Sequence, residues 1–315
     1  MSPCSSSTFP MGGSGSSMEL CVAIAGIKIC IVSAPGMTLE LDRTVRPFEV
    51  ESASPDVTIR SSWCELRAAF DGELVFDSGD LWKLYRNDNS FVFRFTSPAF
   101  GEIPYKVATF DSAFRTGEVC LHRSYFDTAI PVYPLQYPLD ELLVLSVLSQ
   151  FGDISVHACG VVDERGNGYL FPGPSGAGKT TMARLWQLRA GAVVLNDERI
   201  IVRRREERFW IYGTPWHGEA EFAEPVCAPL TRVFFLRKDS MKTIRSMSGA
   251  EAAVRLFSNI YRPFHDKKCL EATLRFIDQV VSEVPFVDLG VVPDDEMAQF
   301  LMKAQSATNH TNLTT

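Results

Sequence analysis

The segment Gly173–Thr180, with the sequence Gly-Pro-Ser-Gly-Ala-Gly-Lys-Thr, has residue types and a spacing that could bind phosphate. It matches the pattern G-x-x-x-x-G-K-[ST], in which glycines let the backbone curl so that successive N–H groups converge on phosphate oxygens. Lys179 would place a positive charge on the β and γ phosphates, and the Thr180 hydroxyl would ligate Mg²⁺. The alternative is a glycine-rich turn with an exposed lysine. The pattern favours a nucleotide phosphate site formed by Gly173, Pro174, Ser175, Gly176, Ala177, Gly178, Lys179, Thr180 and Thr181.

Two adjacent acids, Asp197 and Glu198, begin 17 residues after Thr180 and follow the apolar segment Ala192–Leu195. A helix followed by this strand returns the chain toward the phosphate loop's edge of a sheet, so both carboxylates can approach a metal ion and the γ-phosphate. One acid could then ligate Mg²⁺ while the other accepts a proton from, or orients, an attacking hydroxyl. The alternative is a solvated turn after a strand.

Two further positions could contribute to the same chemistry. His157 lies on the strand before the hairpin that leads into the loop, although a lone strand histidine is more often packed or exposed than catalytic. Glu219 ends the turn-forming cluster Gly213–Glu219 and is a further candidate metal ligand, and Trp216 in that cluster offers a stacking surface. The alternative for the cluster is an ordinary aromatic-rich loop.

The composition excludes several classes of protein. A chain of 315 residues with 46% hydrophobic and 22% charged residues is typical of folded proteins and has room for about two domains. Its net charge of −7 argues against nucleic-acid binding, which needs a surplus of Lys and Arg on one face. The apolar stretch Leu20–Val32 is interrupted by Lys28 and follows no positive segment, so we expect neither a membrane span nor an export signal. Eight dispersed cysteines without a C-x-x-C pair indicate reduced thiols in a cytoplasmic protein.

The chain divides into segments of different pattern. Residues 1–17 are rich in Ser, Gly and Pro and are predicted to be a disordered linker, and the tail 306–315 is also predicted to be disordered. Residues 18–124 show short alternating apolar segments between turn residues and predict a smaller β-rich domain. A Pro-rich linker, 125–138, leads into an α/β domain over 139–305.

The elements of this second domain must position the candidate residues. The strand Tyr169–Phe171 should lead into the phosphate loop and the helix Lys179–Ala190 should leave it. Further strands are predicted at Ile154–Val161, Ala192–Leu195, Ile200–Arg204, Arg208–Tyr212, Arg232–Leu236 and Phe286–Leu289. Further helices are predicted at Pro138–Gln150, Gly249–Tyr261, Lys268–Val281 and Asp294–Lys303. In the β-rich domain the pattern predicts a hairpin around Gly26, a strand at Phe48–Glu51 and one short helix at Trp63–Phe70.

Taken together, these motifs resemble the catalytic domain of HPr kinase/phosphorylase and its HPr-kinase-like relatives. That group is related to the ATP-type phosphoenolpyruvate carboxykinases. The likeness covers about residues 150–240 and is carried by four segments: Ser155–His157, Gly173–Thr180, Leu195–Arg199 and Gly213–Trp216.

The resemblance implies a P-loop kinase domain of the HPr kinase/phosphoenolpyruvate carboxykinase-like type that uses ATP and Mg²⁺. In that family the histidine lies near the transferred phosphate, the first acid is the base toward a Ser hydroxyl, and the second acid assists with Mg²⁺. By resemblance these roles fall to His157, Asp197 and Glu198. The implied activity is transfer of the γ-phosphate to a serine of a protein or peptide, either an HPr-like protein or a modified-peptide precursor. A homo-oligomer is compatible with this activity.

Two other functions stay open from the sequence. One is a nucleotide-binding regulatory module, in which ATP occupancy changes a partner interface and no phosphate is transferred. The other is a small-molecule kinase or a carboxykinase-like enzyme. The presence of both acids and His157 favours chemistry over binding alone, whereas nothing in the sequence distinguishes a peptide acceptor from a metabolite.

Overall fold

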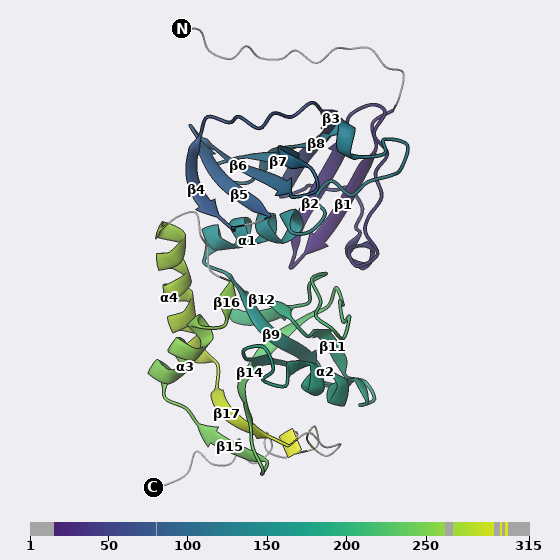
Figure 1. The fold of residues 1–315 in the computed structure, drawn as a ribbon. Coiled ribbons are helices and arrows are strands. Elements are labelled where there is room, and N and C mark those ends of the chain that lie inside the picture. The colour runs from purple at the N-terminus through teal and green to yellow at the C-terminus, as the bar shows by residue number, and fades with distance from the viewer. Residues whose placement is uncertain (1–15, 80, 262–266, 293–296, 298–299, 302–315) are drawn as a thin grey trace. The chain divides into compact units, whose positions relative to one another are not determined.

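The computed structural model describes residues 16–79, 81–261, 267–292, 297 and 300–301. It shows two large sheets and few helices, which confirms a mixed α/β fold (Figure 1). The chain divides into two compact units. The first contains the residues up to Cys21, Ile29–Leu41 and Ser52–Pro134. The second contains Val22–Lys28, Asp42–Glu51 and the chain from Leu135 onward.

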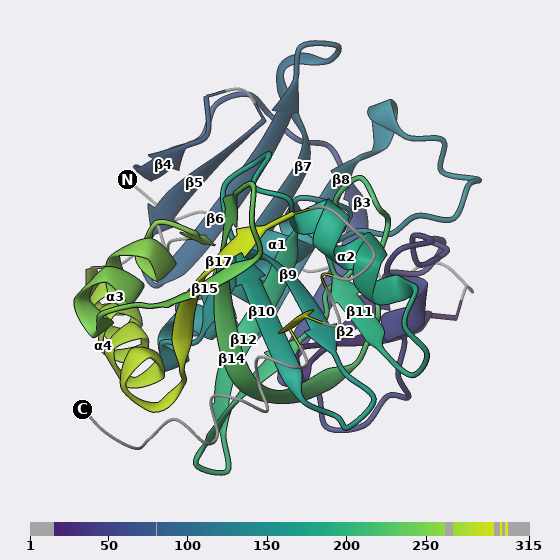
Figure 2. The ribbon, with the colours of Figure 1, turned by 90° about the horizontal axis from the view of Figure 1, so that it is seen from below.

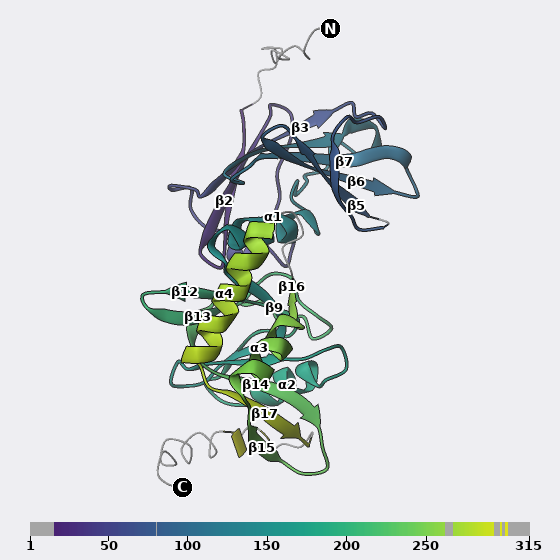
Figure 3. The ribbon, with the colours of Figure 1, turned by 90° about the vertical axis from the view of Figure 1, so that its left-hand side faces the viewer.

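One sheet, formed mostly by residues of the first unit, has eight strands in the order β1-β2-β3-β8-β7-β6-β5-β4. The strands are β1 (Glu19–Ile24), β2 (Ile27–Ser33), β3 (Val57–Cys64), β4 (Glu73–Asp77), β5 (Trp82–Asn87), β6 (Ser90–Ser97), β7 (Gly101–Asp111) and β8 (Thr116–His122). Strand β3 pairs in parallel with both β2 and β8, and the meander from β8 to β4 is antiparallel. Figure 3 shows β3, β7, β6 and β5 succeeding one another across this sheet.

Alternating burial explains why these segments are strands. In β7 every second residue from Pro104 to Phe110 is buried, so one face of the strand packs on the core. The predicted hairpin around Gly26 is confirmed. The predicted helix at Trp63–Phe70 is wrong: Trp63 belongs to β3 and lies opposite Leu121, because sheet pairing on a central strand overrides the local pattern. The strand at Phe48–Glu51 is also wrong, since Phe48 belongs to the short 3-10 helix Arg46–Phe48, in whose first turn Pro47 is favoured.

The cysteines of the first unit depart from the expectation of reduced thiols. Cys21 is bonded to Cys30 across the β1–β2 hairpin, and Cys64 at the end of β3 is bonded to Cys120 of β8. The partners are 9 and 56 residues apart, so strand pairing rather than a short motif brings them together. These cysteines therefore give no support for a cytoplasmic location. Among the described residues, Cys159, Cys227 and Cys269 do not take part in a disulfide bond.

The second unit holds a nine-stranded mixed sheet and the helices α1 to α4. Its strands are β9 (Ile154–Val162), β10 (Gly168–Pro172), β11 (Val193–Asn196), β12 (Arg199–Arg205), β13 (Arg208–Tyr212), β14 (Cys227–Lys238), β15 (Thr243–Ser246), β16 (Ile260–Tyr261) and β17 (Phe286–Val291). Its helices are α1 (Leu139–Phe151), α2 (Lys179–Gln187), α3 (Gly249–Phe257) and α4 (Lys267–Glu283). Strand β9 pairs with β10, β11, β12 and β16, so it connects the strands that surround the segment Gly173–Thr180.

Two apolar layers cover the two faces of this sheet. Along β9, Val156 and Ala158 join the layer that includes α3 and α4, whereas Cys159 and Val161 join the layer that includes α2. Figures 1 and 2 show α3 and α4 on one side of the strands and α2 on the other. A strand that is buried on both faces carries a nearly continuous apolar sequence, as the segment Ile154–Val162 does.

Most predicted elements of this unit are confirmed, with changed ends. Helix α2 stops at Gln187 rather than Ala190, and the helix expected over Gly249–Tyr261 ends at Phe257 and is followed by β16. The helix expected over Asp294–Lys303 lies largely outside the described residues, as do the predicted disordered segments at the two ends of the chain. Within the described part of the chain, no helix combines the length and the apolar character that crossing a membrane requires.

Candidate active site

The phosphate-loop sequence connects the end of β10 to the start of α2, as its motif predicts. Gly176 and Gly178 have φ values of +78° and +108°, in the region that L side chains avoid. A Cβ atom on either glycine would meet nothing within 4 Å, so backbone conformation and not crowding requires glycine here. The loop therefore curls next to open space at the N-terminal end of a helix, which is the arrangement that cradles an anion.

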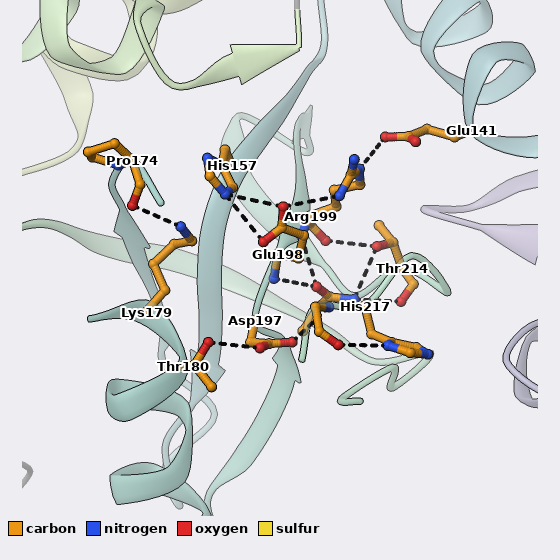
Figure 4. A network of polar contacts seen from close by, with 12 residues as sticks. Glu141, His157, Pro174, Lys179, Thr180, Asp197, Glu198, Arg199, Thr214 and His217 are labelled. Atoms are coloured by element: carbon orange, nitrogen blue, oxygen red, sulfur yellow. Dashed lines mark hydrogen bonds and ion pairs between the residues drawn. The ribbon is translucent and has the colours of Figure 1, made fainter. Parts of the chain in front are cut away.

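Lys179, the first residue of α2, is buried. Its Nζ donates hydrogen bonds to the carbonyl oxygens of Gly173 at 2.9 Å and Pro174 at 3.2 Å (Figure 4). Burial holds the pKa of Lys179 below its usual value, against the opposing attraction of Glu198, Cys159 and Asp197. The ammonium group is thus held by its own loop and lies within electrostatic reach of both acids.

Asp197, directly after β11, reaches the segment Gly173–Thr180. Its side chain is buried, and its Oδ2 accepts a hydrogen bond from the Thr180 hydroxyl at 3.2 Å (Figure 4). The same carboxylate accepts hydrogen bonds from the backbone N–H groups of Gly218 at 3.0 Å and Ala220 at 3.3 Å. The predicted return of the chain to the loop is therefore found, and the acid that contacts Thr180 is Asp197.

Glu198 faces a different neighbour. Its two carboxylate oxygens each lie 3.2 Å from Nε2 of His157 on β9, and Figure 4 shows this pair between the phosphate loop and Arg199. The hydrogen bond from His157 holds the pKa of Glu198 below its usual value, and burial works in the opposite direction. Because Arg199 lies opposite His157 in the β9–β12 register, strand pairing keeps the histidine beside the acidic pair.

Asn196 holds the turn from which the side chains of Asp197 and Glu198 point toward different partners. Its buried side-chain oxygen accepts hydrogen bonds from the backbone N–H groups of Glu198 at 2.7 Å and Arg199 at 2.8 Å. Its Nδ2 donates to the carbonyl oxygen of Thr214 at 3.0 Å, and the Thr214 hydroxyl donates to the carbonyl oxygen of Arg199 at 2.8 Å. This residue ties the acidic turn to the neighbouring loop. Asn196 was missed from the sequence, where an asparagine before two acids suggests only a turn.

Other predicted positions lie outside this group of contacts. Glu219 is exposed, and among the described residues its side chain makes no hydrogen bond or ion pair with the group. Thr181 is exposed on α2, and Trp216 is buried, so it presents no open stacking face. The loop that carries Glu219 and Trp216 does reach the site, through the N–H groups of Gly218 and Ala220 that bind Asp197.

No protein-family model matches the chain, and no curated protein matches it. Among solved structures, the chain is similar to the structure of the Hpr(Ser) kinase/phosphatase from Coxiella burnetii, with 11% sequence identity and a TM-score of 0.27. That match covers 51% of this chain and 99% of the other. A TM-score this low supports no transfer of residue roles to this chain.

Proposed function

We propose that this protein is a kinase that uses ATP and Mg²⁺ to phosphorylate a hydroxyl, namely a serine of a protein or peptide. One observation carries the proposal: a phosphate-binding loop motif whose threonine hydroxyl is 3.2 Å from a buried carboxylate, Asp197. Beside it, within the same unit, lies the His157–Glu198 pair. A loop that only bound phosphate would not need this second set of groups.

The residues present fit a nucleotide phosphate and Mg²⁺. The donor set next to the loop, the Thr180 hydroxyl and the Asp197 carboxylate, consists of hard oxygen atoms, which Mg²⁺ prefers. The open space beside Gly176 and Gly178 allows a phosphate to approach the backbone closely. When bound, Mg²⁺ would neutralise phosphate charge and orient the transferred group.

The directions of the two acids suggest how they divide the work. The resemblance implies that Asp197 is the base and Glu198 the metal residue. The contact of Asp197 with Thr180 favours the opposite division: Asp197 on the metal side, and Glu198 with His157 on the side of the attacking hydroxyl. Lys179 would leave the carbonyls of Gly173 and Pro174 to meet the phosphates. Glu219, the other predicted metal ligand, would need to move inward from its exposed position.

The test combines phosphate transfer with a Mg²⁺ titration. The protein is incubated with γ-labelled ATP, Mg²⁺ and a cell lysate, and the labelled acceptors are identified. With such an acceptor, Asp197→Asn should raise the Mg²⁺ concentration for half-maximal activity by roughly tenfold, because a neutral amide is a poorer ligand for a hard cation. Glu198→Gln should lower kcat by roughly 10² at saturating Mg²⁺, with little change in the metal requirement.

A matched control is Glu164→Gln, which changes an exposed acid on a turn of the same unit and should leave both quantities unaltered. If instead Asp197→Asn lowers kcat and Glu198→Gln raises the Mg²⁺ requirement, the roles are those that the resemblance implies, with Asp197 as the base and Glu198 as the metal residue. If the wild-type protein binds ATP but labels nothing, and Asp197→Asn changes only a partner's affinity, the regulatory module becomes the better description. Labelling of small molecules alone would identify a metabolite kinase.

A further inference from the structure

Arg199 lies between two carboxylates at the edge of the candidate site. Its Nε is hydrogen-bonded to Oε1 of Glu141 on α1, and its Nη1 is 3.3 Å from Oε1 of Glu198 (Figure 4). The guanidinium carbon also lies 4.6 Å from the ring centroid of Tyr261. One planar group thus makes three contacts, to a helix, an acid of the site and an aromatic ring.

Stability does not explain this arrangement well. The side chains of Arg199 and Glu141 are only 16% and 7% exposed. Desolvation of two buried charges offsets most of their attraction, and apolar residues of similar size in place of a buried ion pair are often neutral or stabilising. Burial accordingly raises the pKa of Glu141, although Arg199 opposes this effect. If the net contribution of such a pair to folding is small, an orienting role accounts for its presence.

The geometry suits such a role. Glu198 has three side-chain torsions, and its contact with His157 alone leaves the carboxylate free to rotate about that single nitrogen. The guanidinium has a rigid fork, so fixing Nε on Glu141 also fixes the direction in which Nη1 meets Glu198. Glu141 is in the first turn of α1, where the helix dipole favours an acid, and it is buried there.

Glu141 also limits the pull of Arg199 on Glu198. A guanidinium with Glu198 as its sole anionic partner would compete with His157 for that carboxylate. Because Arg199 is bound to Glu141, the charge of the guanidinium is already partly neutralised. The 3.3 Å contact between Arg199 and Glu198 therefore leaves both contacts of Glu198 with His157 in place.

We propose that Arg199 is a positioning residue, braced by Glu141 and Tyr261, that holds the Glu198 carboxylate against His157. The inference rests on the proposed function, because Glu198 needs a fixed direction only if it acts on a substrate. It makes helix α1 part of the support of the site, although no residue of α1 belongs to the phosphate-loop motif.

The experiment replaces the ion pair by apolar residues in the double variant Glu141→Leu/Arg199→Met. If the Glu141–Arg199 pair had only a structural role, this replacement would leave the activity unchanged. We expect a melting temperature equal to or above that of the wild type. We also expect kcat to fall about tenfold or more, with KM for ATP within about twofold of the wild-type value. Crystal structures of wild type and variant should show the Glu198 carboxylate displaced from Nε2 of His157 in the variant only.

Arg199→Lys is the second variant, since it keeps the charge but lacks a fork that can reach both carboxylates. It should lower kcat and displace Glu198 in the same way. If the double variant does not fold, this variant decides whether Arg199 positions the Glu198 carboxylate. The control is Arg203→Met/Asp153→Leu, another buried ion pair involving β12 (2.7 Å), which should leave kcat unchanged.

The proposal is overturned if the double variant has the same kcat as the wild type. It is also overturned if the Glu198 carboxylate still lies 3.2 Å from His157 in the crystal structure of the double variant. If the wild-type protein transfers no phosphate, the proposed kinase function fails, and the crystallographic comparison still decides the role of Arg199.

Discussion

Replacement of Lys179 by methionine tests the phosphate loop most directly. Methionine fills most of the buried space of the lysine and removes its ammonium group. The variant loses the hydrogen bonds from Nζ to the carbonyls of Gly173 at 2.9 Å and Pro174 at 3.2 Å. It also removes the positive charge nearest to the expected phosphates.

Two effects oppose each other in the ligand-free protein. A hydrogen bond from a charged donor contributes about 1.5–3 kcal/mol. Burial nevertheless lowers the pKa of Lys179, in spite of the attraction of Glu198 and Asp197. The folded protein therefore binds this proton less tightly than the unfolded chain does. The protonated lysine costs stability at neutral pH, and this cost disappears as the pH rises above the unfolded-state pKa. We expect the melting temperature of the ligand-free variant to equal or exceed that of the wild type.

The effect on transfer has the opposite sign. One charge-assisted contact with the transferred phosphate corresponds to about 2.7 kcal/mol of transition-state stabilisation, or roughly 10² in rate. The assay measures phosphate transfer from labelled ATP together with thermal unfolding with and without ATP and Mg²⁺. Lys238→Met, an exposed lysine at the end of β14, is the control and should change neither quantity.

Turnover within twofold of the wild type would refute the assignment of Lys179 to the phosphates. A large fall in the melting temperature of the ligand-free variant would show instead that the lysine holds the loop together. In that case the loss of turnover would say nothing about catalysis.

Two further outcomes follow from the structure. Removal of divalent cations with EDTA should abolish transfer, and added Mg²⁺ should restore it, because Lys179 alone cannot neutralise the phosphates; full activity in excess chelator would contradict this. Breaking the Cys64–Cys120 bond, whose partners are 56 residues apart, should lower the free energy of unfolding of the first unit by about 4 kcal/mol. Thermal melting with and without a reductant checks this, and the expectation fails if thiol counting shows complete reduction without a change in melting.

The parts of the second unit that sequence predicts well depend on contiguous residues. The phosphate loop is one uninterrupted motif, and the flanking segments have clear strand and helix periods, so β10 and α2 are found at the expected places. The return of β11 to the loop could also be foreseen, since it follows from the order of the elements. These features need no knowledge of contacts between distant segments.

The misses concern pairings between distant segments. Trp63 has the local pattern of a helix, but β8 fixes it in a strand. The bond between Cys64 and Cys120 depends on the same pairing of strands. Glu141 and Arg199 are 58 residues apart, and a sequence gives no sign that these two charges meet. In these three cases tertiary contacts decide the outcome and local propensity does not.

The acidic pair shows most clearly why chemical roles are harder to predict than elements. Asp197 and Glu198 are neighbours in sequence, and from their order alone either could serve the metal. The turn fixed by Asn196 sends them to different partners: Asp197 to the Thr180 hydroxyl, and Glu198 to His157. Because the partner of each carboxylate determines what it can bind or accept, direction is a stronger argument for its role than position along the chain. We therefore propose that, in this kinase, Asp197 serves the metal ion and Glu198 the attacking hydroxyl.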